Sequence, residues 1–89
     1  MLLLGMGTYA QTVVSGTVTD TNGEPVPGAN IVIVGKAIGT TTDFDGNFSL
    51  ETSEMPPFDL RITSIGYTEG SARVESSGQT LAITLSEAQ

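Results

Sequence analysis

The chain has neither cysteine nor histidine among its 89 residues. The first absence excludes a disulfide framework and thiolate metal sites. The second removes imidazole ligands, Ser-His and Cys-His nucleophile pairs and the commonest general base near neutral pH. Because nothing in the pattern indicates a cleft that holds paired carboxylates either, we predict that the protein is not an enzyme. We expect no catalytic, metal-binding or cofactor-binding residues.

Basic residues are nearly absent as well. Lys36, Arg61 and Arg73 stand against ten carboxylates, which gives a net charge of −7. Nucleic acids and anionic membrane surfaces are bound through clusters of Lys and Arg. Neither is therefore expected as a partner, and the acidity predicts a well-solvated surface.

The first ten residues differ from the rest of the chain. Residues 1–7 are apolar and uncharged, and the small Thr8 and Ala10 fit the two positions at which signal peptidase accepts small side chains. The apolar run is much shorter than the roughly 20 residues of a membrane span, and no cysteine follows it for lipid attachment. We interpret residues 1–10 as a signal-peptide remnant that is cleaved after Ala10. A first strand or a disordered terminus is the alternative.

From Val13 onward, short β-type runs alternate with turn residues. Strands are expected at about residues 14–19, 29–34, 40–42, 48–50, 58–63, 72–74 and 81–85. Asn22-Gly23 and residues 43–47 have the composition of tight turns, with a positive φ expected at Gly46 or Asn47. Pro25, Pro27 and Gly28 are expected to hold their segment extended and unpaired. About seven strands at this spacing, with no helical stripe, predict an all-β sandwich or barrel.

Alternation along these strands also predicts the core. The inward side chains are expected to be Val14, Val18, Ala29, Ile31, Ile33, Phe48, Leu50, Phe58, Leu60, Ile62, Tyr67, Val74, Leu81, Ile83 and Leu85. Such a small core has no apolar surface to spare for a ligand cavity, which typically takes about 300 Å3 or more. We therefore expect no buried substrate site.

One segment imitates a calcium loop. Asp43, Asp45 and Asn47 have the spacing of the first ligands, and Glu54 falls at the twelfth position. The glycine that such a loop needs at its sixth position is replaced by Phe48, which the core requires. A tight turn capped by the Asp43 carboxylate explains the same residues, so we predict a turn and no metal site.

Two aromatic residues are candidates for contact with a ligand or with another domain. Tyr67 follows Gly66, and such a tyrosine more often packs at a sandwich corner, with its hydroxyl bonded to the backbone, than stacks on a ligand. Phe44 is predicted at the tip of a turn, where an exposed aromatic ring is suited to docking on a neighbouring domain.

Three sequence blocks carry a family resemblance. They are residues 15–31, with the run Gly-Glu-Pro-Val-Pro-Gly-Ala-Asn-Ile at their end, residues 39–48 and residues 64–67. In this order and spacing they resemble the carboxypeptidase-regulatory-like (transthyretin-like) domain, and more narrowly the copy at the N-terminus of SusC/RagA-type TonB-dependent receptors. The resemblance implies a seven-stranded Greek-key, prealbumin-like (Ig-like) β-sandwich over residues 11–86. Residues 87–89 would begin a linker to a missing downstream region.

The same resemblance implies a function. The chain would be a non-catalytic periplasmic accessory domain of a TonB-dependent outer-membrane receptor in a Gram-negative bacterium, and the receptor would import glycans or other nutrients. Its partners would be proteins of the periplasm, namely the receptor plug and the TonB system, without insertion of the domain itself into the membrane. An adhesin-like or carbohydrate-binding module and the regulatory domain of a secreted metallopeptidase are the alternatives.

Overall fold

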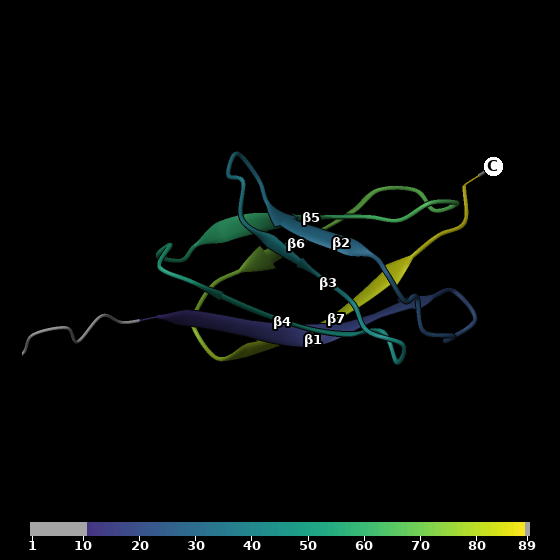
Figure 1. Cartoon of the computed structure of the whole chain (residues 1–89), viewed down its shortest axis with the longest axis horizontal. Helices are drawn as coiled ribbons and strands as arrows, with labels where there is room; N and C mark the ends of the chain where they lie inside the picture. Colours follow the sequence, from purple (N-terminus) through teal and green to yellow (C-terminus); the bar gives the residue numbers. More distant parts are fainter. Residues whose placement is uncertain (1–10, 89) are drawn as a thin grey trace, which may run out of the picture.

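The computed structural model describes residues 11–88, which form seven strands and no helix (Figure 1). The strands are β1 (Thr12–Asp20), β2 (Asn30–Ile33), β3 (Gly39–Thr41), β4 (Asn47–Thr52), β5 (Phe58–Thr63), β6 (Gly70–Val74) and β7 (Gln79–Leu85). They form two facing sheets, so the predicted seven-stranded β-sandwich is confirmed. Within this range no helix is long and apolar enough to cross a membrane. The interpretation of residues 1–10 as a signal-peptide remnant lies outside the described residues.

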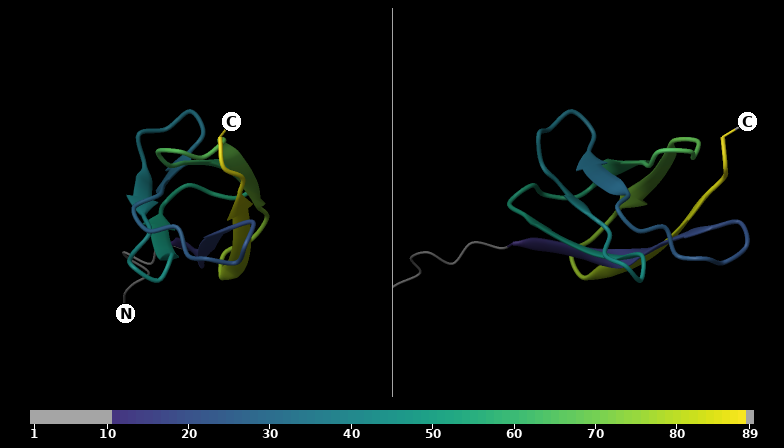
Figure 2. Two further views of the ribbon diagram at one scale, coloured as in Figure 1. Left: turned by 90° about the vertical axis from the view of Figure 1, so that its right-hand side faces the viewer. Right: turned by 45° about the vertical axis from the view of Figure 1, so that its right-hand side comes forward.

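The two sheets have the strand orders β4-β1-β7 and β3-β2-β5-β6, and Figure 2 shows them as two layers. β1 pairs antiparallel with β4 and parallel with β7. Parallel neighbours need a long crossover between them. Here the whole second sheet forms part of that crossover, because β2, β3, β5 and β6 all lie between β1 and β7 in the sequence.

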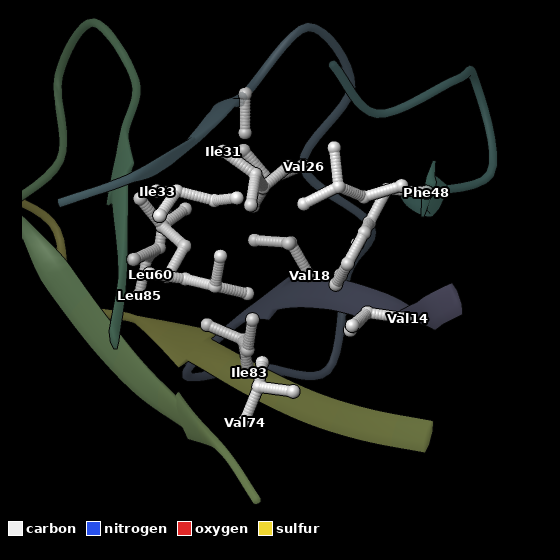
Figure 3. Packing of buried hydrophobic residues seen from close by; sticks show 13 residues of the cluster. Val14, Val18, Val26, Ile31, Ile33, Phe48, Leu60, Val74, Ile83 and Leu85 are labelled. Atoms are coloured by element: carbon white, nitrogen blue, oxygen red, sulfur yellow. The ribbon is translucent and has the colours of Figure 1, made fainter. Parts of the chain in front are cut away.

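The core fills the space between the sheets (Figure 3). Alternation along β1, β4 and β5 turns every second side chain inward, as expected for half-buried strands. Twelve of the thirteen buried hydrophobic residues belong to the predicted inward set, and Val26 is the exception. Three more of that set, Phe58, Tyr67 and Leu81, are half-buried and pack against the margin of the core.

The expectation of an unpaired proline segment was wrong. Pro25 forms a bridge with Thr19, and the Val26 amide donates to the Val18 carbonyl at 3.0 Å. In this segment only the two prolines lack an amide hydrogen, so Val26 between them is free to bond to β1. This bond draws its side chain into the core, where it is 2% exposed.

The strand register assigns the loops to two ends of the sandwich. One end, here named the Phe44 end, carries residues 20–28, 42–46, 64–69 and 86–88, because Asp20 is paired with Leu85 and Thr17 with Asn47. The opposite end, named the Lys36 end, carries residues 34–38, 53–57 and 75–78. In Figure 1 the Phe44 end lies on the right.

Candidate interaction surface

A hydrogen-bonded turn holds Phe44 away from the fold. One carboxylate oxygen of Asp43 accepts hydrogen bonds from the amides of Asp45 and Asn47, each at 2.9 Å. The Gly46 amide donates to the Asp43 carbonyl at 3.0 Å, and Gly46 has a φ of 78°. The predicted positive φ at Gly46 is thereby confirmed. The ring of Phe44, which the turn does not need, is 90% exposed.

The same geometry separates the residues of the calcium-like spacing. Asp43 directs its carboxylate onto the amides of its own turn. Strand β4 then carries the chain to the Lys36 end, where Glu54 lies 3.7 Å from the Lys36 ammonium group. Asp43 and Glu54 therefore lie at opposite ends of a six-residue strand and do not share a site.

Beside Phe44 lies an open groove of about 450 Å3, lined by Pro27, Gly28, Thr42, Asp43 and Phe44. It is a surface feature formed by two loops. The argument from the sequence against a ligand cavity considered only the core, and it missed this groove. The two loops meet because the Gly28 amide donates to the Thr42 carbonyl at 3.2 Å, and the Thr42 amide donates to the Ala29 carbonyl at 3.0 Å.

Thr42 joins the two loops that form the groove. Its side chain is buried, donates to the Val26 carbonyl at 2.6 Å and accepts from the Ala29 amide at 2.9 Å. The hydroxyl therefore has both kinds of partner and offers no free donor to a ligand. In the sequence it is one of three consecutive threonines, and nothing in their pattern distinguishes it from Thr40 and Thr41.

Charge is unevenly distributed between the two ends. Within residues 11–88, the ion pairs join Lys36 to Glu54 and Arg73 to Asp59 and Glu75, all toward the Lys36 end. Six of the remaining carboxylates lie at the Phe44 end, and no ion pair of the described residues includes them. They are Asp20, Glu24, Asp43, Asp45, Glu69 and Glu87. The surface around Phe44 is therefore strongly negative.

A second exposed apolar side chain lies at this end. Ile65 is fully exposed in the loop before β6. This loop pairs with the residues after β7, since the Thr68 amide donates to the Ser86 carbonyl at 2.8 Å and Tyr67 forms a bridge with Glu87. Tyr67 packs against the core as expected. The predicted bond from its hydroxyl to the backbone is not among the hydrogen bonds of residues 11–88.

The described residues do not indicate a metal site at the Phe44 end. In this part of the chain, no group of three or more acidic side chains is arranged to hold a metal ion. The features left at the Phe44 end are thus an exposed aromatic ring, an apolar groove and a set of free carboxylates. Such a surface is suited to contact with another molecule by burial of apolar area and by charge attraction.

Solved structures share the fold. A chain of a type II cohesin–X-dockerin complex from Acetivibrio cellulolyticus matches with a TM-score of 0.71 and 20% identity, over 83% of this chain and 56% of that chain. The 3-chlorocatechol 1,2-dioxygenase of Rhodococcus opacus matches with a TM-score of 0.67 and 10% identity, over 88% of this chain and 60% of the dioxygenase. Identities this low bear on the fold alone.

Sequence relatives are more informative. The TonB-dependent receptor SusC of Bacteroides thetaiotaomicron is 50% identical over 68 residues, which cover 74% of this chain. The TonB-dependent receptor P3 of Formosa agariphila is 47% identical over 78 residues, which cover 83% of it. The chain spans only 6% and 8% of the lengths of these two receptors. A family model described as the CarboxypepD_reg-like domain matches residues 14–89, and the chain therefore belongs to the CarboxypepD_reg-like domain family.

Proposed function

We propose that this domain is a non-catalytic accessory module of a TonB-dependent receptor, that it resides in the periplasm, and that it acts through protein contacts. The observation that carries the proposal is the 50% identity to a segment of the receptor SusC that makes up 6% of that protein. A segment so small beside its host is suited to assist transport and not to form the path. The receptor itself would sit in the outer membrane and import glycans or other nutrients.

The composition supports a role without chemistry. The chain has no cysteine or histidine, and Asp43 and Thr42 at the groove use their side chains to build their own loops. The exposed Phe44 and Ile65 side chains at one end favour docking on another protein. Positioning or stabilising the energised plug is the task that such contacts would perform.

The test is a receptor that lacks residues 12–86 of this domain. We expect a lower uptake rate or a lower receptor abundance, because a periplasmic contact is lost. Substrate affinity at the extracellular face should be unchanged, because that site lies across the membrane. The comparison requires equilibrium binding by purified receptor with and without the domain. A clear loss of affinity at equal folding would contradict the accessory role and favour a ligand-binding module.

A further inference from the structure

We propose that the groove beside Phe44 binds a basic segment of a partner protein, in which lysine or arginine side chains flank an apolar residue. This proposal rests on the accessory function above and names the contact surface and the chemistry of the partner. Three observations carry it: the exposed ring, the charge around it, and the absence of a free side-chain hydrogen-bond donor among the residues that line the groove.

The exposure of Phe44 is not a consequence of the fold. The turn from Asp20 to Glu24 makes the same hydrogen bonds as the turn from Asp43 to Asn47, and it has Thr21 at the position of Phe44. A polar residue therefore satisfies this turn equally well. A ring that is 90% exposed gains little from burial within the chain, so its apolar surface is available for a partner.

The charge pattern selects a cationic partner. Asp43 and Asp45 flank the ring in sequence, and Asp20 and Glu24 lie in the adjoining turn, since Gly46 packs against Pro25. The ion pairs of residues 11–88 leave these four carboxylates free. Lysine or arginine on a partner is attracted to such a rim, and an acidic segment is repelled. A second copy of this chain, with its net charge of −7, would suffer the same repulsion.

The groove is poorly suited to a glycan. Sugar hydroxyls need hydrogen-bond partners when they are buried. The lining residues offer no free side-chain donor, because the Thr42 hydroxyl already donates to the Val26 carbonyl, and one of the two Asp43 carboxylate oxygens already accepts from two amides of its own turn. Pro27 and Gly28 add apolar atoms and little else. An apolar side chain needs no donor in such a groove, whereas sugar oxygens would lose the hydrogen bonds that they accept from water.

The direct test is an NMR titration of the 15N-labelled chain. The probe is a capped peptide with lysines on both sides of a Leu-Pro-Leu centre. Its controls replace every lysine by glutamate or both leucines by serine. We expect amide shifts at Gly28, Phe44 and Asp45 with the lysine peptide alone, and a several-fold weaker affinity when salt rises from about 20 to about 300 mM, because screening shortens the reach of the carboxylates.

Variants locate the contact. Phe44→Thr should lower the peptide affinity by about tenfold, as for an aromatic anchor. Glu24→Gln with Asp45→Asn should lower it by about fivefold and weaken its salt dependence. Neither substitution removes a side chain that builds the turns, since Asp20 and Asp43 do so. Met55→Ser at the Lys36 end is the matched control, because Met55 is also an exposed apolar residue, and it should change nothing.

Five results would overturn the proposal. The first four are equal binding of the glutamate peptide, shifts away from the groove, full affinity in Phe44→Thr, and groove shifts caused by a neutral oligosaccharide instead of peptide. Shifts that depend on protein concentration alone would assign the groove to self-association and also overturn it.

The receptor distinguishes this proposal from the accessory function. If deleting the domain lowers uptake while Phe44→Thr in the receptor leaves uptake unchanged, the accessory function stands and the groove is not its contact. If the peptide binds at the groove as expected but deletion has no effect on uptake or abundance, the accessory function fails and the groove remains a basic-segment site.

Discussion

The turn from Asp20 to Glu24 and the turn from Asp43 to Asn47 have the same hydrogen bonds in different surroundings. In both, a threonine precedes the aspartate and a glycine follows three residues after it. One carboxylate oxygen of each aspartate accepts hydrogen bonds from two backbone amides, at 2.8–2.9 Å. Each glycine has a positive φ, 84° at Gly23 and 78° at Gly46. The local sequence pattern alone therefore determines the shape of the turn.

The surroundings differ at both the glycine and the threonine. A side chain at Gly23 would extend into open space, whereas a Cβ at Gly46 would lie 2.6 Å from the Val18 carbonyl oxygen. Thr42 is buried and bonded to two backbone groups, while Thr19 is half-buried in β1. The tertiary context, and not the turn itself, therefore sets how much the glycine and the threonine contribute to stability. Matched substitutions in the two turns test this separation.

The largest difference is expected at the two glycines. Gly46→Ala should lower the free energy of unfolding by about 3 kcal/mol, because it combines positive-φ strain with displacement of a carbonyl that bonds Val26. Gly23→Ala carries the strain alone and should cost about 1 kcal/mol. Urea unfolding of both variants measures the values. Equal losses at the two positions would show that contact with β1 contributes nothing.

The threonines provide the next test. Thr42→Val keeps the shape of the side chain but leaves the buried Ala29 amide and the Val26 carbonyl without their hydroxyl partner. We expect a loss of about 2 kcal/mol. Thr19→Val changes a side chain for which the described residues form no hydrogen bond, and it should stay within about 0.5 kcal/mol. A similar loss of unfolding free energy for both variants in urea would contradict a stabilising role of the two Thr42 hydrogen bonds.

Much of the fold was predictable because it depends on local pattern. The strand pattern assigned twelve of the thirteen buried hydrophobic residues, and the Asp-Gly and Asn-Gly pairs located both turns. Val26 was missed because its burial depends on a hydrogen bond to Val18 in another segment. The two prolines beside Val26 indicate an unpaired segment and give no sign of this bond. Val34 was expected in a strand at about residues 29–34, yet it follows the end of β2 and is 51% exposed.

The candidate surface was only partly predictable. Phe44 at a turn tip followed from the turn pattern. The groove did not, because it joins residues 27–28 to residues 42–44 through bonds between two loops. The ion pairs of Arg73 toward the Lys36 end also depend on the register of β5 with β6, which places Arg73 beside Asp59. Neither the groove nor these ion pairs could be predicted from the spacing of residues along the sequence.

The two aspartates should give a smaller and equal effect. Asp20→Ala and Asp43→Ala each remove one acceptor of two amides. Because both turns are exposed, water replaces the lost bonds in part, and we expect about 1 kcal/mol for each. Asp→Asn at either position keeps the acceptor oxygen and should recover most of the loss. Thermal melts of the four variants give the change in stability for each turn. A loss of stability in one turn alone would contradict the equivalence of the two turns.

The smallest effect on stability is expected at Phe44 itself. Phe44→Thr makes the second turn like the first, where Thr21 occupies the same position. Since the ring is 90% exposed, little apolar surface returns to water, and the free energy of unfolding should change by no more than about 0.5 kcal/mol. The reciprocal Thr21→Phe should be equally neutral. Phe44→Thr should nevertheless lose affinity for the lysine peptide, while Thr21→Phe keeps it, because the groove lies beside Phe44. A marked drop in melting temperature on Phe44→Thr would instead assign the ring a structural role, and its exposure would no longer be evidence for a partner.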